Sequence, residues 1–213
     1  MATPLKLRDQ LRLNDELYRK TGCIFGLERL TEKEKNPGLY EAVWHILLSV
    51  CNTAWEVGCK VSASPVAAEG GDALWALHTP TGECICTSRG ITAHVGLLAS
   101  MVRKLIELGY EDLPGFRQGD IFENNDPHYG GIHMPDMDTA MPIFHQGRLI
   151  AWASSVTHVA DAGAVLQRLA GSRIGFLRGA YNGLTTMTTM AWYLDAANVP
   201  AAVYPGPPKK VIA

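Results

Sequence analysis

Two stretches of the chain repeat apolar residues at intervals of three and four positions, the spacing that places side chains on one face of an α-helix. The first runs from Asn36 to Ser62 and predicts a largely buried helix. The second runs from Ile91 to Tyr110, with Gly109 placed to end it. The apolar positions are Leu39, Val43, Ile46, Leu47, Val50 and Trp55 in the first stretch, and Val95, Leu98, Met101, Val102 and Leu105 in the second.

Short apolar runs bounded by turn residues predict strands between and after these helices. Ala73–Ser88 holds two such runs around Pro80-Thr81-Gly82, which indicates a β-hairpin. Thr139–His158 predicts a longer hairpin with Gln146-Gly147 at its tip, and a short strand is expected at Asp120–Glu123. Because strands and helices do not alternate in a β-α-β order, we expect an α+β fold of mixed helices and antiparallel hairpins.

The character of the sequence changes twice along the chain. Residues 1–36 are charged and irregularly patterned, and we expect a short helix at Leu11–Lys20 followed by a linker. Residues 37–165 carry the helices and hairpins and form the predicted domain. Residues 166–213 are rich in Gly, Ala, Thr and Pro and are expected to be a poorly ordered tail.

Composition narrows the function classes. Apolar residues make up 47% and charged residues 19% of the chain, as in globular proteins. A formal net charge of −2 and scattered basic residues argue against nucleic acid or an anionic membrane as partner. No apolar run is long enough to cross a bilayer, so a cytoplasmic location is expected, with the five cysteines reduced. The phosphate-loop pattern GxxxxGK[ST] is absent, which leaves an internal nucleotide site without its usual signature.

The stretch NNDPHYGGIHMPDMD, Asn124 to Asp138, gathers aspartates and histidines in a segment that cannot be a regular helix or strand. Prolines interrupt any helix, and Gly130-Gly131 permits a sharp turn. His133 and Asp136 would point to opposite faces of an extended strand, so only a turn brings them together.

His158 is the candidate third ligand. It closes the strand RLIAWASSVTH, and the intervening hairpin returns its end close to the loop. Two imidazoles and one carboxylate with open positions suit Fe(II) or Mn(II), while zinc remains possible. Asp126, Asp138 and Asp161 are left to orient the ligands or to act as a base. The competing interpretation is ordinary turn chemistry, in which Asp126 and Asp138 only cap turns and the loop histidines are solvated.

The region from Gly119 to Gly163, GDIFENNDPHYGGIHMPDMDTAMPIFHQGRLIAWASSVTHVADAG, resembles the signature region of the hydantoinase B/oxoprolinase family. The resemblance extends over roughly Pro37 to Val165. It implies that His133, Asp136 and His158 bind the metal, and that ATP is used on a separate partner subunit of the hydantoinase A type. The segment EGGDALWALH is more similar to the acetone and acetophenone carboxylase branch than to the hydantoinases, and the chain looks like a short or truncated member.

The expected function is therefore that of the metal-binding subunit of an ATP-dependent ketone carboxylase within a hetero-oligomer. The divalent cation, Mn, Fe or Zn, would stabilise a developing enolate oxygen, with Asp126 or His128 moving protons. Two alternatives stay open, namely ATP-dependent hydrolysis of a cyclic amide and a non-catalytic fragment. Trp75, Leu77 and His78 either line a substrate pocket or belong to the core.

Overall fold

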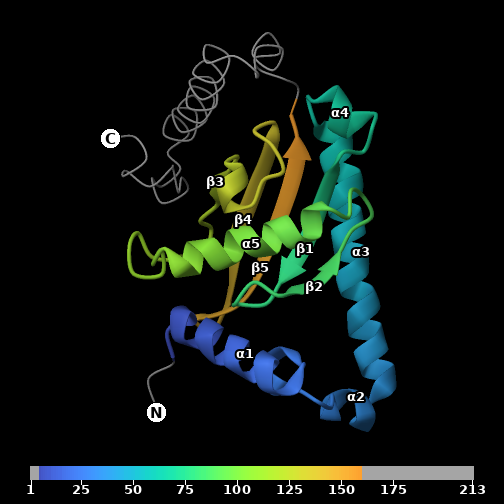
Figure 1. Cartoon of the computed structure of the whole chain (residues 1–213). Helices are drawn as coiled ribbons and strands as arrows, with labels where there is room; N and C mark the ends of the chain where they lie inside the picture. The colour runs from blue at the N-terminus through green and yellow to red at the C-terminus, as the bar shows by residue number, and fades with distance from the viewer. Residues whose placement is uncertain (1–4, 160–213) are drawn as a thin grey trace.

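The computed structural model describes residues 5–159, which form one antiparallel sheet with helices on both faces (Figure 1). The sheet has five strands in the order β2-β1-β5-β4-β3. The strands are β1 (Ala73–His78), β2 (Cys84–Thr87), β3 (Phe122–Asn124), β4 (Asp136–His145) and β5 (Arg148–His158). The helices are α1 (Leu7–Thr21), α2 (Thr31–Lys35), α3 (Pro37–Val61), α4 (Pro65–Ala68) and α5 (His94–Glu107), with short 3-10 turns η1 (Ile24–Gly26) and η2 (Pro127–Tyr129).

Both predicted hairpins and the α+β class are confirmed. β1 and β2 pair antiparallel, as do β4 and β5, and β1 also pairs antiparallel with β5. The chain therefore places the second hairpin in the middle of the sheet and the first along its side. The predicted strand at Asp120–Glu123 is displaced, because β3 covers Phe122–Asn124.

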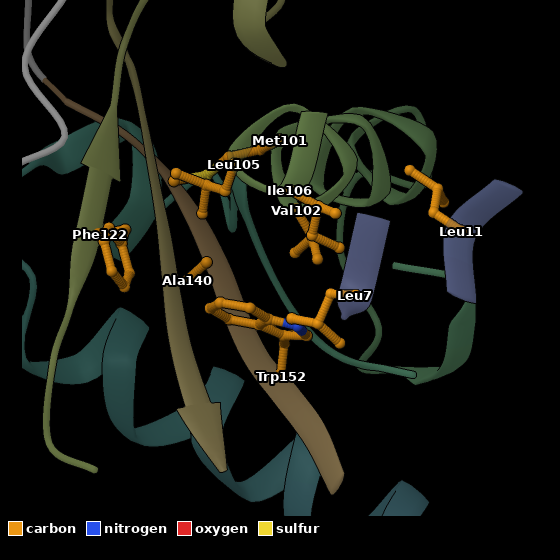
Figure 2. Close-up of a cluster of buried hydrophobic side chains, with 9 residues drawn as sticks. All are labelled: Leu7, Leu11, Met101, Val102, Leu105, Ile106, Phe122, Ala140 and Trp152. Carbon is orange, nitrogen blue, oxygen red and sulfur yellow. The ribbon is translucent and has the colours of Figure 1, made fainter. Parts of the chain in front are cut away.

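The main core lies between α5, α1 and the β3–β5 side of the sheet. Figure 2 shows the side chains that meet there, which come from α1, α5, β3, β4 and β5. Trp152 of β5 and Phe122 of β3 are fully buried, and Phe116 packs edge-on against both rings, with centroids 4.9 and 5.4 Å away. The buried cluster consists of Leu7, Leu11, Met101, Val102, Leu105, Ile106, Phe122, Ala140 and Trp152.

The N-terminal helix contributes to this core. α1 begins at Leu7 and ends at Thr21, so it is longer than the helix expected at Leu11–Lys20. Its Leu7 and Leu11 are buried against α5, and Arg103 of α5 forms an ion pair with Asp15 at 2.9 Å. Residues 7–21 are therefore packed onto the domain rather than extended away from it.

α3 lies on the other face of the sheet, over β1 and β2. Gly58 sits directly against the ring of Trp75, and Trp55 donates to the carbonyl oxygen of Ala73 at 3.2 Å. This contact requires glycine, because a Cβ at position 58 would lie 2.2 Å from the Trp75 ring.

The helix predicted over the first apolar stretch is present, but the prediction that it is largely buried is wrong. Leu39, Ile46 and Val50 are 60%, 61% and 55% exposed. α3 meets the sheet through the face that carries Cys51 and Cys59, and within residues 5–159 no element covers the apolar face. A three- and four-residue spacing shows that a helix has an apolar side, and it does not show what packs on that side.

Candidate metal centre

The loop between β3 and β4 is held against α5 by its backbone. Asp126 caps the 3-10 turn η2, and its carboxylate accepts from the backbone N–H of His128 at 2.9 Å. Gly130 then passes close to α5 with φ +137°, where a Cβ would lie 2.8 Å from the Leu97 carbonyl oxygen. Only glycine fits this approach, and it directs the following residues towards the end of the sheet.

Asp136 is the anchor of the site. It is the first residue of β4 and is fully buried. Its Oδ2 accepts hydrogen bonds from the backbone N–H groups of Ile132 and His133, at 3.2 and 3.3 Å. The backbone N–H of Asp136 in turn donates to the His133 carbonyl oxygen at 3.0 Å. This tight turn supplies the bend that the sequence requires to bring His133 and Asp136 together.

His158 reaches the same point from the other strand of the hairpin. It is the last residue of β5 and lies directly opposite Asp136 in the β4–β5 register. Its Nδ1 lies 3.2 Å from Asp136 Oδ1, while His133 Nδ1 lies 3.2 Å from Asp136 Oδ2. The two imidazole rings meet edge to face with centroids 4.7 Å apart. The three residues nominated from the sequence therefore converge.

The donor set and its spacing fit a divalent cation. One ligand atom from each of the three residues can be chosen so that all lie within 4.8 Å of one another. Two ligands that are each about 2.1 Å from a cation lie roughly 3.0–3.4 Å apart. Each imidazole is 3.2 Å from a different carboxylate oxygen of Asp136, so the side chains have to draw closer than 4.8 Å for all three residues to hold one cation. The His133 side chain is 49% exposed, so one side of the cluster faces solvent. Such an open side is what a catalytic site needs and a closed structural site lacks.

Two further residues border the cluster, and sequence reasoning did not nominate them as site residues. Asp72, just before β1, has Oδ2 3.7 Å from His158 Nδ1, and its backbone carbonyl oxygen accepts from the His158 N–H at 3.1 Å. The buried His94, at the start of α5, lies with Nε2 3.4 Å from Asp72 Oδ1. The pairing of β1 with β5 brings Asp72 here, and the packing of α5 on the sheet brings His94 to Asp72. No short spacing in the sequence indicates either contact.

Asp138 is a second buried carboxylate beside the anchor. Burial, together with the nearby charge of Asp136, raises the pKa of Asp138 to about 8 against a partial offset from Asn124. The amide of Asn124 lies 3.4 Å from Asp138 Oδ2, and Oδ1 has no hydrogen-bond partner in the described part of the chain. Asp138 is therefore uncharged near neutral pH in this arrangement.

The other sequence candidates stand apart from the three-residue cluster. Asp126 acts as the cap described above, and His128 is exposed on η2. Their proposed roles in proton transfer stay predictions. Asp161 lies outside the described residues. His78 is fully buried in β1, with Nδ1 3.0 Å from Ser154 Oγ, and belongs to the interior of the sheet rather than to a surface pocket.

Comparison with known proteins places this arrangement in context. A family model described as Hydantoinase B/oxoprolinase matches residues 36–171. The acetone carboxylase alpha subunit of Xanthobacter autotrophicus is 38% identical over 147 residues, which is 69% of this chain and 19% of that protein. The acetophenone carboxylase delta subunit of Aromatoleum aromaticum is 32% identical over 95 residues, which is 45% of this chain and 14% of that protein.

A solved nucleotide-free structure of acetone carboxylase has the same fold in this region. It matches with a TM-score of 0.71 at 35% identity, over 74% of this chain and 21% of that chain. The chain thus spans about a fifth or less of the length of these relatives. Within residues 5–159, no helix is long and apolar enough to cross a membrane.

Proposed function

The chain belongs to the hydantoinase B/oxoprolinase family, and on that premise we propose that it is the metal-binding part of an ATP-dependent ketone carboxylase of the acetone carboxylase kind. In this proposal His133, Asp136 and His158 hold a divalent cation, Mn, Fe or Zn. ATP is used on a separate subunit of the hydantoinase A type, so the working enzyme is a hetero-oligomer. The substrate is a small ketone.

The convergence of the three ligands is the observation that carries this proposal. Their donor atoms come from a turn and from two paired strands, and Asp136 is held by two backbone N–H groups before any cation arrives. A site preorganised in this way loses little conformational entropy on binding a cation. The carboxylase branch is supported by the 38% identity to the acetone carboxylase alpha subunit.

Each part of the site has a distinct task in this chemistry. A bound divalent cation would supply Lewis-acid stabilisation to negative charge developing on a substrate oxygen. Asp136 fixes the position of the charge, and the exposed side of His133 leaves room for a substrate to approach. Asp126 and His128, on the same loop, are the residues proposed to move protons.

Hydrolysis of a cyclic amide, also ATP-dependent, is the second candidate function. The family description itself covers oxoprolinases, and the same three ligands would serve either reaction. A non-catalytic role is the third, and the metal content of the purified chain separates it from the other two.

The metal content of the purified chain tests whether His133, Asp136 and His158 hold a cation. We expect near-stoichiometric Mn, Fe or Zn in the wild type and its loss in Asp136→Ala and His158→Ala. His145→Ala is the matched control, because His145 is exposed at the far end of β4. A folded wild-type chain that takes up none of these metals would refute the metal site and leave the non-catalytic role.

Activity assays then separate the two reactions. The metal-loaded chain is combined with a hydantoinase A-type subunit and ATP, and is offered acetone or acetophenone with bicarbonate, or 5-oxoproline and a hydantoin. Carboxylate product formed only with the ketones supports the carboxylase proposal. Ring opening of the amides without ketone turnover contradicts it in favour of the hydrolase.

A further inference from the structure

Asp72 touches the metal centre from a segment that is distant from it in the sequence. Its backbone carbonyl oxygen accepts from the N–H of His158 at 3.1 Å, and its Oδ2 lies 3.7 Å from His158 Nδ1. The same ring nitrogen lies 3.2 Å from Asp136 Oδ1. Two carboxylates from different parts of the chain therefore lie beside one edge of the His158 ring, and Asp136 is the one that belongs to the three-residue cluster.

The backbone at Asp72 is fixed on both sides. Its N–H donates to the carbonyl oxygen of Val66 at 3.2 Å. Gly71 has a φ of +68°, a left-handed conformation that glycine adopts without strain, and it turns the chain into β1. Ala73, the first residue of β1, lies opposite Thr157 of β5. The sheet therefore sets the position of Asp72 beside the end of β5.

His94 fixes the side chain of Asp72. It is the first residue of α5, it is 3% exposed, and its Nε2 lies 3.4 Å from Asp72 Oδ1. The Asp72 side chain is 30% exposed, so a carboxylate without such a partner could turn towards water. A buried polar group is normally paired, and Asp72 provides the pairing for this ring nitrogen. The contacts thus run in a line from His94 to Asp72 to His158.

The orientation of the His158 ring matters for a cation. A histidine ring turns about its χ2 bond, and half a turn would place a carbon atom where Nδ1 now faces Asp136. A carboxylate accepts from a ring nitrogen and has no comparable interaction with a ring carbon. The carboxylate of Asp72 therefore favours the orientation in which the nitrogen faces Asp136. A ring that is already oriented lowers the cost of binding, and carboxylates beside metal-ligating histidines commonly have this effect.

We propose that Asp72 is a positioning residue of the metal centre, and that His94 acts on the centre through Asp72. The proposal rests on the metal site of the proposed function. In this role Asp72 holds the end of β5 through its backbone and the His158 ring through its carboxylate. His94 keeps that carboxylate turned towards the ring.

Cobalt(II) titration of the purified full chain tests this proposal, because the visible absorption of cobalt reports the arrangement of its ligands. Competition with a chelator gives the dissociation constant. Asp72→Ala and His94→Phe are each expected to raise this constant about tenfold or more. The spectrum of the cobalt-saturated Asp72→Ala variant should also differ from that of the wild type.

The double variant Asp72→Ala/His94→Phe distinguishes positioning through Asp72 from two separate effects. If His94 acts through Asp72, the double variant binds cobalt no more weakly than Asp72→Ala alone. Two independent effects would multiply to about a hundredfold or more. Glu69→Ala is the matched control, because Glu69 is exposed and removes the same charge three residues earlier. Less than about threefold is expected for it.

Each contrary outcome has a distinct meaning. A wild type that binds no cobalt, Mn, Fe or Zn refutes the metal site and this proposal together. A wild type that binds cobalt no better than Asp72→Ala refutes the positioning role alone. Equal weakening by Glu69→Ala shows a general effect of charge, and multiplied effects in the double variant refute the action of His94 through Asp72.

Urea denaturation of the metal-free variants confirms that each is folded. Asp72→Asn, which has nearly the same shape as the wild-type side chain, repeats the test without leaving a gap.

Discussion

Replacing His78 by asparagine separates the pH response of one buried imidazole from that of the rest of the chain. His78 is fully buried in β1, opposite Trp152 of β5, and its Nδ1 lies 3.0 Å from Ser154 Oγ. Burial lowers its pKa from 6.5 to about 4, although the charge of Glu83 acts in the opposite direction. The imidazole is therefore neutral in the folded chain at neutral pH.

The lowered pKa of His78 determines how the stability of the fold changes with pH, in both direction and size. The unfolded chain binds the proton below pH 6.5, whereas the folded chain does not until about pH 4. The stability associated with the neutral ring is thus fully present above pH 6.5 and is lost as the pH falls towards 4. At 1.36 kcal/mol per pH unit the loss is about 2 kcal/mol at pH 5 and about 3 kcal/mol when complete.

Urea denaturation of metal-free protein at pH 7, 6 and 5 measures the difference. Asparagine keeps an acceptor near Ser154 but does not titrate, so His78→Asn should be less stable than the wild type at pH 7 because of the lost ring volume. The gap should then close by about 2 kcal/mol between pH 7 and pH 5. Parallel stability curves for the two proteins would refute the reasoning, because they would mean that His78 takes up its proton equally in both states.

Three further predictions concern close packing and the second buried carboxylate. Gly130→Ala should destabilise the fold by about 2 kcal/mol in urea denaturation and reduce bound metal, because its Cβ would meet the Leu97 carbonyl oxygen at a φ of +137°; unchanged stability would contradict the close approach. Gly58→Ala should cost about 1–3 kcal/mol and shift Trp75 fluorescence, since the new Cβ displaces that ring; an unaltered spectrum and midpoint would contradict it. Metal-free wild type should lose up to roughly 4 kcal/mol of stability between pH 5 and pH 8, because a carboxyl with a raised pKa favours the unfolded state as it ionises. Asp138→Asn should not show this loss, since asparagine does not ionise. Identical pH dependence of the two proteins in denaturation would count against it.

The local parts of the site were predictable from the sequence. The turn between His133 and Asp136 follows from residues that prohibit regular structure, and the return of His158 follows from a hairpin with Gln146-Gly147 at its tip. Both are short-range consequences of chain geometry.

The long-range parts were not predictable in the same way. Asp72 reaches His158 because β1 pairs with β5, a contact between distant segments that no periodicity encodes. The exposure of Ile46 had the same origin, since a helical pattern defines an apolar face without defining its neighbour. The buried Leu7 came from a stretch whose charges suggested a linker, because α1 contributes few apolar residues to the core.

Because Asp136 lies opposite His158, the metal centre also depends on the register between β4 and β5. If β5 slipped by one residue along β4, His158 would turn to the opposite face of the sheet and leave the cluster. The register of β4 against β5 shifts between Ile143 and Phe144, which lie between the hairpin tip and the site. The turn at the tip therefore does not fix the register at Asp136 and His158 through an uninterrupted ladder of hydrogen bonds. A cation bound by both strands would favour the native alignment over its neighbours, and the order of the central hairpin should then increase with metal occupancy.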